Sequence, residues 1–247
     1  MKVTAYPTEK VTGRSNIFHI FDNALTHVPE RSIVIVTSKV VALCEGAAVP
    51  IGASQKTELI EREAEYYLDP SNKYNISLTI KNGILIPSAG IDESNADGHY
   101  VLWPRNPQQS ANEIREYLEK RFGLKEVGVI ITDSKTTPLR WGTTGMAIVH
   151  SGFQALKNYI GKPDLFGRIM KITKANIMDG LAAAAVVVMG EGDEQTPLVL
   201  IEDVPLCQFD RRNPTEEELK ALRIELDDDL YAPMLSAVNW KKGGKLY

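Results

Sequence analysis

The sequence predicts a mixed fold of α-helices and β-strands. Short apolar runs rich in β-branched residues alternate with longer amphipathic segments along the chain, and such alternation indicates helices packed on sheets. The dipeptide Asn82-Gly83 separates two of the apolar runs and predicts a tight hairpin, because both residues tolerate the positive φ of a two-residue turn. Neither a P-loop nor a Gly-x-Gly-x-x-Gly fingerprint occurs, which excludes both of those nucleotide-binding motifs.

The N-terminal part of the chain carries four expected elements. Residues 3–6 form a short expected strand, and the turn at 13–16 caps an expected helix at 17–25. Residues 32–36 are sufficiently β-branched to predict a buried strand. Residues 56–68 place apolar side chains on one side at helical spacing and end at Asp-Pro, so an amphipathic helix is expected there.

The middle of the chain begins with the two arms of the hairpin. These arms are residues 76–80 and 84–86. Residues 107–122 have the apolar spacing of a helix, and Gly123 is expected to end it. Residues 127–131 are almost entirely apolar, as is typical of a central strand that is buried on both faces.

The C-terminal part adds one more strong helix signal. After an expected strand at 146–149, residues 176–189 are rich in alanine and have the strongest helix propensity in the chain. Residues 198–201 predict a short strand. A final helix is expected from Pro214 onward, because proline is accepted at the first helical position and the acids that follow favour the positive end of a helix. The sequence shows no repeat and no linker.

Composition restricts the function. The 247 residues are 43% hydrophobic and 24% charged, which predicts a substantial core, and the formal net charge of -4 argues against a nucleic-acid-binding basic face. Cys44 and Cys207 lack paired spacing, so buried free thiols are expected. The longest apolar run, 181–189, is too short to cross a bilayer, and the N-terminus lacks a signal-peptide pattern. A cytoplasmic protein with no nucleic-acid or membrane partner is expected.

Three acidic loops follow apolar runs, and each places a carboxylate where buried structure meets solvent. The loops are 87–95, 132–135 and 190–194, and their acids are Asp92, Asp133 and Glu191. Carboxylate oxygens are natural ligands of Mg²⁺ and Mn²⁺, which bridge proteins to nucleotide phosphates. A single acid of this kind is usually a solvated turn residue. Three of them at the ends of apolar runs predict a shared site for divalent cations and phosphates.

Other polar residues allow two interpretations each. Thr37-Ser38-Lys39 follows the expected strand at 32–36 and suits either phosphate contact or an ordinary helix cap. Lys135, Arg140 and Arg168 are candidates for gripping substrate carboxylates or phosphates, or are simply surface charges. His150 follows an apolar strand and is expected to be a packed structural residue rather than a catalytic base.

The conspicuous blocks together resemble a known family. The blocks at 87–95, 129–134 and 188–192, with Thr37-Ser38-Lys39 and Glu45-Gly46 upstream, resemble the coenzyme F420-0:L-glutamate gamma-glutamyl ligase family. The resemblance covers residues 1–205, which gives an expected ligase domain followed by a C-terminal helical extension at 206–247. It implies an α+β fold with a mixed sheet, without a P-loop or Rossmann motif, in an intertwined homodimer.

The resemblance also implies chemistry and site residues. Family members use GTP, two Mg²⁺ or Mn²⁺ ions and a helper cation such as K⁺ to join L-glutamate to a carboxylate through an acyl phosphate. Carried over by position, Asp92 and Asp133 become catalytic ligands of one metal, and Ser134 and Glu191 help to hold the second. The implied nucleotide contacts are Ser38, Lys39, Asn95, Met189, Gly190, Gly192, Asp193, Gln195 and Thr196.

Two departures from the family pattern leave the substrates open. Leu43 stands where relatives carry a lysine, and Gly180 replaces an acid often seen after Asp179. Loss of a cation beside a phosphate weakens that contact by ~1 to 3 kcal/mol. The nucleotide is therefore GTP or ATP, and the acceptor is F420-0, a folate or another small carboxylate. The alternatives are a nucleotide- and metal-binding homologue without ligase chemistry and a metal-dependent phosphohydrolase.

Overall fold

A five-stranded mixed sheet forms the centre of the computed structural model, which describes residues 1–244. The strand order is β1 (Lys2–Tyr6), β12 (Leu198–Glu202), β2 (Ser32–Thr37), β8 (Val127–Thr136) and β9 (Thr143–Ser151). β2 and β8 are parallel, and the other neighbours are antiparallel. This arrangement confirms the expected mixed sheet in an α+β fold.

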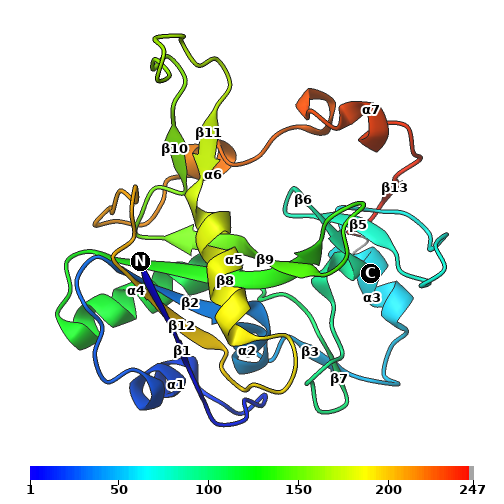
Figure 1. The fold of residues 1–247 in the computed structure, drawn as a ribbon. Helices are drawn as coiled ribbons and strands as arrows, with labels where there is room; N and C mark the ends of the chain where they lie inside the picture. The colour runs from blue at the N-terminus through cyan, green and yellow to red at the C-terminus, as the bar shows by residue number, and fades with distance from the viewer. Residues whose placement is uncertain (245–247) are drawn as a thin grey trace.

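Helices cover both faces of the central sheet (Figure 1). α1 (Ile17–Ala24) and α4 (Pro107–Phe122) cover one face, where Val34 of β2 joins their apolar cluster. α5 (Ile177–Met189) covers the other face, where Ile35 of β2 joins its cluster. Successive strand residues point to opposite faces, so a strand between two helical layers must be apolar throughout. This requirement explains the unbroken apolar runs in the sequence.

A smaller four-stranded sheet lies beside the central one. Its order is β13 (Lys241–Lys242), β4 (Tyr66–Tyr67), β5 (Leu78–Lys81) and β6 (Ile84–Pro87). The turn between β5 and β6 has φ of 52° at Asn82 and 70° at Gly83, which confirms the predicted two-residue hairpin. β6 leads into the short helical turn η1 (Ser88–Gly90) and then into the first acidic loop.

Short elements connect the two sheets. α2 (Ser38–Cys44) follows β2 directly, and β3 (Ala48–Pro50) pairs with β7 (His99–Val101). α3 (Lys56–Glu63) is shorter than the helix expected at 56–68. The expected helix end was wrong because the following tyrosines form β4, whose pairing with β5 determines their backbone conformation.

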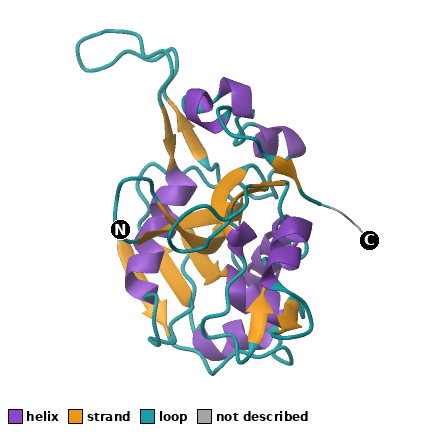
Figure 2. Cartoon of the chain, turned by 90° about the vertical axis from the view of Figure 1, so that its right-hand side faces the viewer, coloured by secondary structure: helices purple, strands orange, loops and turns teal. Residues whose placement is uncertain are grey.

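A hairpin and a C-terminal segment extend from this body (Figures 1 and 2). The hairpin is β10 (Leu156–Asn158) with β11 (Lys174–Asn176). The C-terminal segment contains α6 (Glu216–Lys220), η2 (Leu226–Asp228) and α7 (Ala232–Leu235), and it returns to the small sheet as β13. The expected extension at 206–247 thus contains helices, and its last three residues lie outside the described residues.

Several smaller expectations can be compared with the structure. Gly123 ends α4 with φ of 68°, as predicted, whereas Thr215 caps α6, so Pro214 precedes that helix rather than opening it. Cys44 and Cys207 are free but only half-buried, and burial raises the pKa of these thiols to about 11 and about 12. Among residues 1–244, no helix has the length and apolar character needed to cross a membrane.

Candidate functional site

A cavity of about 610 Å³ lies at the ends of β1 and β2, and the segments that follow these two strands line it. β2 ends at Thr37, which pairs with Thr132 of the parallel strand β8, so the segments that follow these two residues lie side by side. The cavity is closed on its other sides by the acidic loop after β6, by the loop after α5 and by the segment 8–12.

Every residue that the resemblance assigned to metal or nucleotide lines this cavity. These residues are Ser38, Lys39, Asp92, Asn95, Asp133, Ser134, Met189, Gly190, Glu191, Gly192, Asp193, Gln195 and Thr196. Lys135, Arg140 and Arg168 are not part of the lining. The structure therefore brings the predicted residues together, and their individual roles stay predictions.

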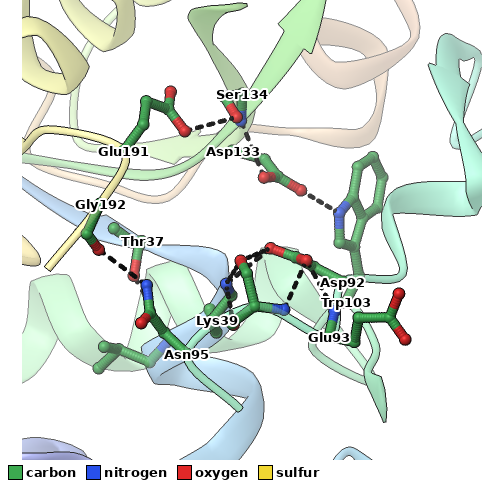
Figure 3. Close-up of polar contacts among 12 residues, drawn as sticks. Thr37, Lys39, Asp92, Glu93, Asn95, Trp103, Asp133, Ser134, Glu191 and Gly192 are labelled. Carbon is green, nitrogen blue, oxygen red and sulfur yellow. Dashed lines mark hydrogen bonds and ion pairs between the residues drawn. The ribbon is translucent and has the colours of Figure 1, made fainter.

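Asp92 and Lys39 form the ion pair at the centre of the site (Figure 3). Lys39 Nζ lies 2.7 Å from Asp92 Oδ2 and also donates to the carbonyl oxygen of Ser94 at 2.7 Å. The Ser94 hydroxyl donates to Asp92 Oδ2 at 2.7 Å, and its backbone N–H donates to Oδ1 at 2.9 Å. Partial burial acts to raise the pKa of Asp92, but the hydrogen bonds from Lys39 and Ser94 outweigh it and hold the pKa at about 2.

Asp133 lies in a more enclosed position on β8. Its Oδ2 accepts the indole N–H of Trp103 at 2.6 Å, and its Oδ1 accepts the backbone N–H of Ser134 at 2.8 Å. Burial raises the pKa of Asp133 to about 6, although both of these N–H groups favour the ionised form. A carboxylate that is costly to ionise beside a cavity is a candidate for cation binding or catalysis.

The residues around Asp133 are in a strand, not in the loop expected at 132–135. β8 continues to Thr136 because it stays paired with β9, and the register between these strands shifts between Ile131 and Thr132. An irregularity of this kind turns the following side chains relative to the rest of the sheet. The expected loop was wrong because the sequence of β8 alone does not reveal its long pairing with β9.

The loop after α5 completes the cavity wall. Glu191 Oε2 accepts the Ser134 hydroxyl at 3.3 Å, and the Gly192 carbonyl accepts the Asn95 amide at 2.8 Å. Gly190 has φ of 77°, and a Cβ there would lie 2.2 Å from the Glu194 side chain. The third acidic loop is thus joined to both of the others by direct hydrogen bonds (Figure 3).

Comparison with known proteins identifies the family. A family model described as "F420-0:Gamma-glutamyl ligase" matches residues 11–203. The chain belongs to the F420-0:gamma-glutamyl ligase family. As a member of this family, it is a ligase that forms carbon–nitrogen bonds.

Proteins named "Coenzyme F420:L-glutamate ligase" are among its relatives. The one from Methanococcus maripaludis strain C6 is 38% identical over 193 residues, covering 72% of this chain and 77% of the relative. The one from Methanosarcina mazei is 34% identical over 233 residues, covering 85% and 90%. The one from Methanocaldococcus jannaschii is 41% identical over 167 residues, covering 66% of each.

The ligase cavity contains donors of the kind that Mg²⁺ and Mn²⁺ prefer. Asp92, Asp133 and Glu191 contribute carboxylates and Ser134 a hydroxyl, all lining one cavity, and these hard oxygen donors fit such ions in chemical type. In the described part of the chain, no three acidic, histidine or cysteine side chains are already grouped as a metal centre. Lys39 instead supplies the positive charge beside Asp92.

Sequence reasoning missed three contributors to the ligase site. Ser94 and Trp103 hold the two aspartates, and the segment 8–12 lines the cavity. Ser94 carried a usable signal, because it lies two residues after an aspartate, where side chains commonly bond to the backbone. Thr37 caps α2, which confirms the helix-cap interpretation of Thr37-Ser38-Lys39. The segment also lines the cavity, and its contact with phosphate stays a prediction.

His150 is outside the site, as expected. It is only 3% exposed, and its ring lies 5.2 Å from that of Phe153 in an edge-on arrangement. Burial lowers the pKa of His150 to about 4, so the ring is neutral at physiological pH and serves as a packing group.

Proposed function

We propose that this protein joins L-glutamate to the carboxylate of F420-0 or a closely related acceptor, with GTP and divalent cations. The observation that supports this function is the meeting of Asp92, Asp133 and Glu191 in one cavity of a family member. These acids come from three distant parts of the chain, so their convergence is a property of the fold. The name of the curated relatives supports glutamate and an F420-type acceptor as substrates.

The acids and the basic group have separate proposed tasks. Asp92 and Asp133 would hold one Mg²⁺ or Mn²⁺, and Ser134 with Glu191 would help to hold a second. Bound divalent cations would neutralise the charge that develops on the transferred phosphoryl group. Lys39 lines the same cavity and would pair with nucleotide phosphates when a metal ion replaces it beside Asp92.

The remaining predicted residues would orient the nucleotide. Ser38 and Asn95 line the cavity from two sides, and the segment 189–196 lines a third. The Asn95 amide already bonds the Gly192 carbonyl at 2.8 Å, so these two walls are held at a fixed separation. Preorganised walls matter here because positioning supplies most of the rate enhancement in phosphoryl transfer.

The proposed reaction has two steps. An oxygen of the acceptor carboxylate attacks the γ-phosphorus of GTP, the bond to the bridging oxygen breaks, and GDP leaves. The amine of L-glutamate then attacks the carbonyl carbon of the acyl phosphate, inorganic phosphate leaves, and the amine loses a proton as the amide forms. The net products are GDP, phosphate and the glutamyl amide.

Phosphate release measured together with mass spectrometry of the amide product tests this function. Purified protein with Mn²⁺, GTP, L-glutamate and F420-0 should release phosphate and form the glutamyl adduct. Asp133→Ala should lower turnover by more than ~100-fold, because loss of an outer-shell partner alone costs ~10- to 100-fold at metal sites. Asp97→Ala is the matched control, since Asp97 is an exposed acid on the same cavity wall. Unchanged turnover in Asp133→Ala would refute the site.

Leu43 supports one alternative to a working ligase. It lines the cavity and is 8% exposed, so an apolar side chain occupies the place where the family resemblance implies a lysine. Binding of GTP by calorimetry without glutamate-dependent phosphate release over a panel of acceptors would indicate a homologue that has lost ligase chemistry. Phosphate release that does not require glutamate would instead indicate a phosphohydrolase. A gain in GTP affinity in Leu43→Lys would show that the lost cation matters.

We also propose that the ligase works as a homodimer. The segment between β10 and β11 exposes Leu165, Phe166 and Ile172 at 92%, 93% and 87%, and a second copy would remove these apolar side chains from water. The wild-type chain should elute at dimer mass in light-scattering chromatography. Phe166→Asp should weaken the dimer, and a monomeric wild-type chain at micromolar concentration would refute the proposal.

A further inference from the structure

Trp103 holds the second aspartate of the cavity. It lies just after β7 and is 2% exposed, and its indole N–H donates to Asp133 Oδ2 at 2.6 Å (Figure 3). Ser134 N–H occupies the other oxygen of the same carboxylate. Each oxygen of Asp133 thus accepts one N–H and keeps a further acceptor position for a ligand.

Gly90 provides the space for this indole. Gly90 has φ of 71°, and a Cβ at this position would lie 2.1 Å from Trp103 Nε1 and 2.5 Å from Cε2. A methyl group cannot fit at these distances, so the indole would have to move. Gly90 lies two residues before Asp92 in the first acidic loop. The loop that carries one aspartate therefore also shapes the pocket of the tryptophan that orients the other.

Lys81 makes a further contact with the indole. Lys81 Nζ lies 5.4 Å from the centroid of the Trp103 ring and 2.9 Å from Glu63 Oε2. The Lys81 side chain is only 10% exposed, and a cation over an indole is attracted more strongly when it is shielded from water. The ring thus has a defined partner on β5 as well as on β8.

We propose that Trp103 is a positioning residue of the ligase site, where its N–H fixes the Asp133 carboxylate and Gly90 keeps the indole in place. The inference rests on the proposed function in one respect, namely that Asp133 acts as a metal ligand. Outer-shell groups that bond a ligating carboxylate orient it and tune its affinity for metal. Trp103 has this relation to Asp133, although it does not line the cavity itself.

Two substitutions separate positioning from simple packing. Trp103→Phe keeps an aromatic ring and removes the N–H donor, together with the volume of the five-membered ring of the indole. Gly90→Ala keeps the donor and displaces the ring. Gly123→Ala is the matched control for the second, because Gly123 has φ of 68° and no atom within 4 Å of an added Cβ. Gly90→Ala and Gly123→Ala therefore carry a similar backbone penalty, and only the first disturbs the indole.

The primary readout is the affinity for Mn²⁺ alone, measured by calorimetry on the full chain without substrates. Trp103→Phe and Gly90→Ala should weaken Mn²⁺ binding by ~10- to 100-fold, whereas Gly123→Ala should bind like the wild type. In Trp103→Phe and Gly90→Ala, kcat should fall by a larger factor than the KM for GTP changes. A Trp103→Phe variant that folds and keeps wild-type Mn²⁺ affinity would overturn the inference.

A second readout needs neither metal nor activity. The indole ¹H–¹⁵N resonance of Trp103, assigned by its loss in Trp103→Phe, should lie downfield and exchange slowly in the metal-free wild type, because the N–H is buried and bonded to a carboxylate. It should move in Gly90→Ala and stay in place in Gly123→Ala. A fast-exchanging indole in the wild type would also overturn the inference. Wild-type Mn²⁺ binding and an ordered indole without glutamate-dependent phosphate release would refute the proposed function and leave the positioning role standing.

Discussion

Asp133→Asn should make the metal-free protein more stable while it abolishes ligase activity. Burial raises the pKa of Asp133 from its ordinary value of 3.8 to about 6 in the folded chain. Below pH 3.8 the side chain is protonated in both states, so it does not affect stability. As the pH rises from 3.8 to 6 the unfolded chain ionises first, and stability falls. Above pH 6 Asp133 is ionised in both states, and the fold bears the full free-energy cost of the buried charge.

The size of this penalty follows from the two pKa values. They differ by about two, and each unit corresponds to ~1.36 kcal/mol, so ionised Asp133 destabilises the fold by ~3 kcal/mol at pH 8 and ~1.5 kcal/mol at pH 5. The amide introduced by Asp133→Asn has one oxygen, whereas both the Trp103 indole N–H and the Ser134 backbone N–H donate to the carboxylate. The hydrogen bond that is lost costs ~1 kcal/mol. The expected net gain is therefore ~2 kcal/mol at pH 8 and ~0.5 kcal/mol at pH 5, with the melting temperature at pH 8 ~5 °C higher.

Urea unfolding in EDTA at the two pH values measures this gain. Asp97→Asn is the control, because Asp97 is an exposed acid on the same cavity and its substitution should change stability by less than ~0.5 kcal/mol. Equal stabilisation by Asp133→Asn at pH 5 and pH 8 would refute the reasoning, since it would not arise from ionisation. Destabilisation at pH 8 would refute it as well.

Three further outcomes are expected. Leu118→Ala should lower the free energy of unfolding by ~2 to 5 kcal/mol in urea, because this side chain is completely buried in the core. The contribution of ionised Asp92 to stability should fall by ~1 kcal/mol or less as acidification from pH 4 to 2 protonates this side chain, whose pKa is about 2 and which is half-exposed. Lys39→Met should reduce the loss of wild-type stability over this range in acid titrations followed by circular dichroism. Gly145→Ala should lower the melting temperature far more than Gly180→Ala, because a Cβ at Gly145 would lie 2.4 Å from a backbone oxygen of α5 and one at Gly180 meets open space.

Much of the fold could be predicted because its signals are local. The Asn82-Gly83 turn, the glycine after α4 and the apolar runs of β2 and the first part of β8 each identify their own element. The failures occurred where a distant partner decides the structure. β4 replaced the end of an expected helix because β5 lies beside it, and Thr132–Lys135 continued as strand because β9 pairs with it. Neither partner can be identified from the residues of the element itself.

The meeting of Lys39 with Asp133 in the site depends on one feature of the sheet topology. Thr37 pairs with Thr132 only because β2 and β8 run parallel, and this register places Lys39 and Asp133 at the same edge of the sheet. With antiparallel strands the same two sequences would end at opposite edges, and the hydroxyl–lysine segment could not meet the aspartate. The sequence could therefore indicate that each acid follows an apolar run, but the parallel pairing of β2 with β8 decides that Lys39 and Asp133 line the same cavity. Trp103 was beyond sequence reasoning for a similar reason, because its partner Asp133 is thirty residues away along the chain and only the tertiary fold brings the two side chains into contact.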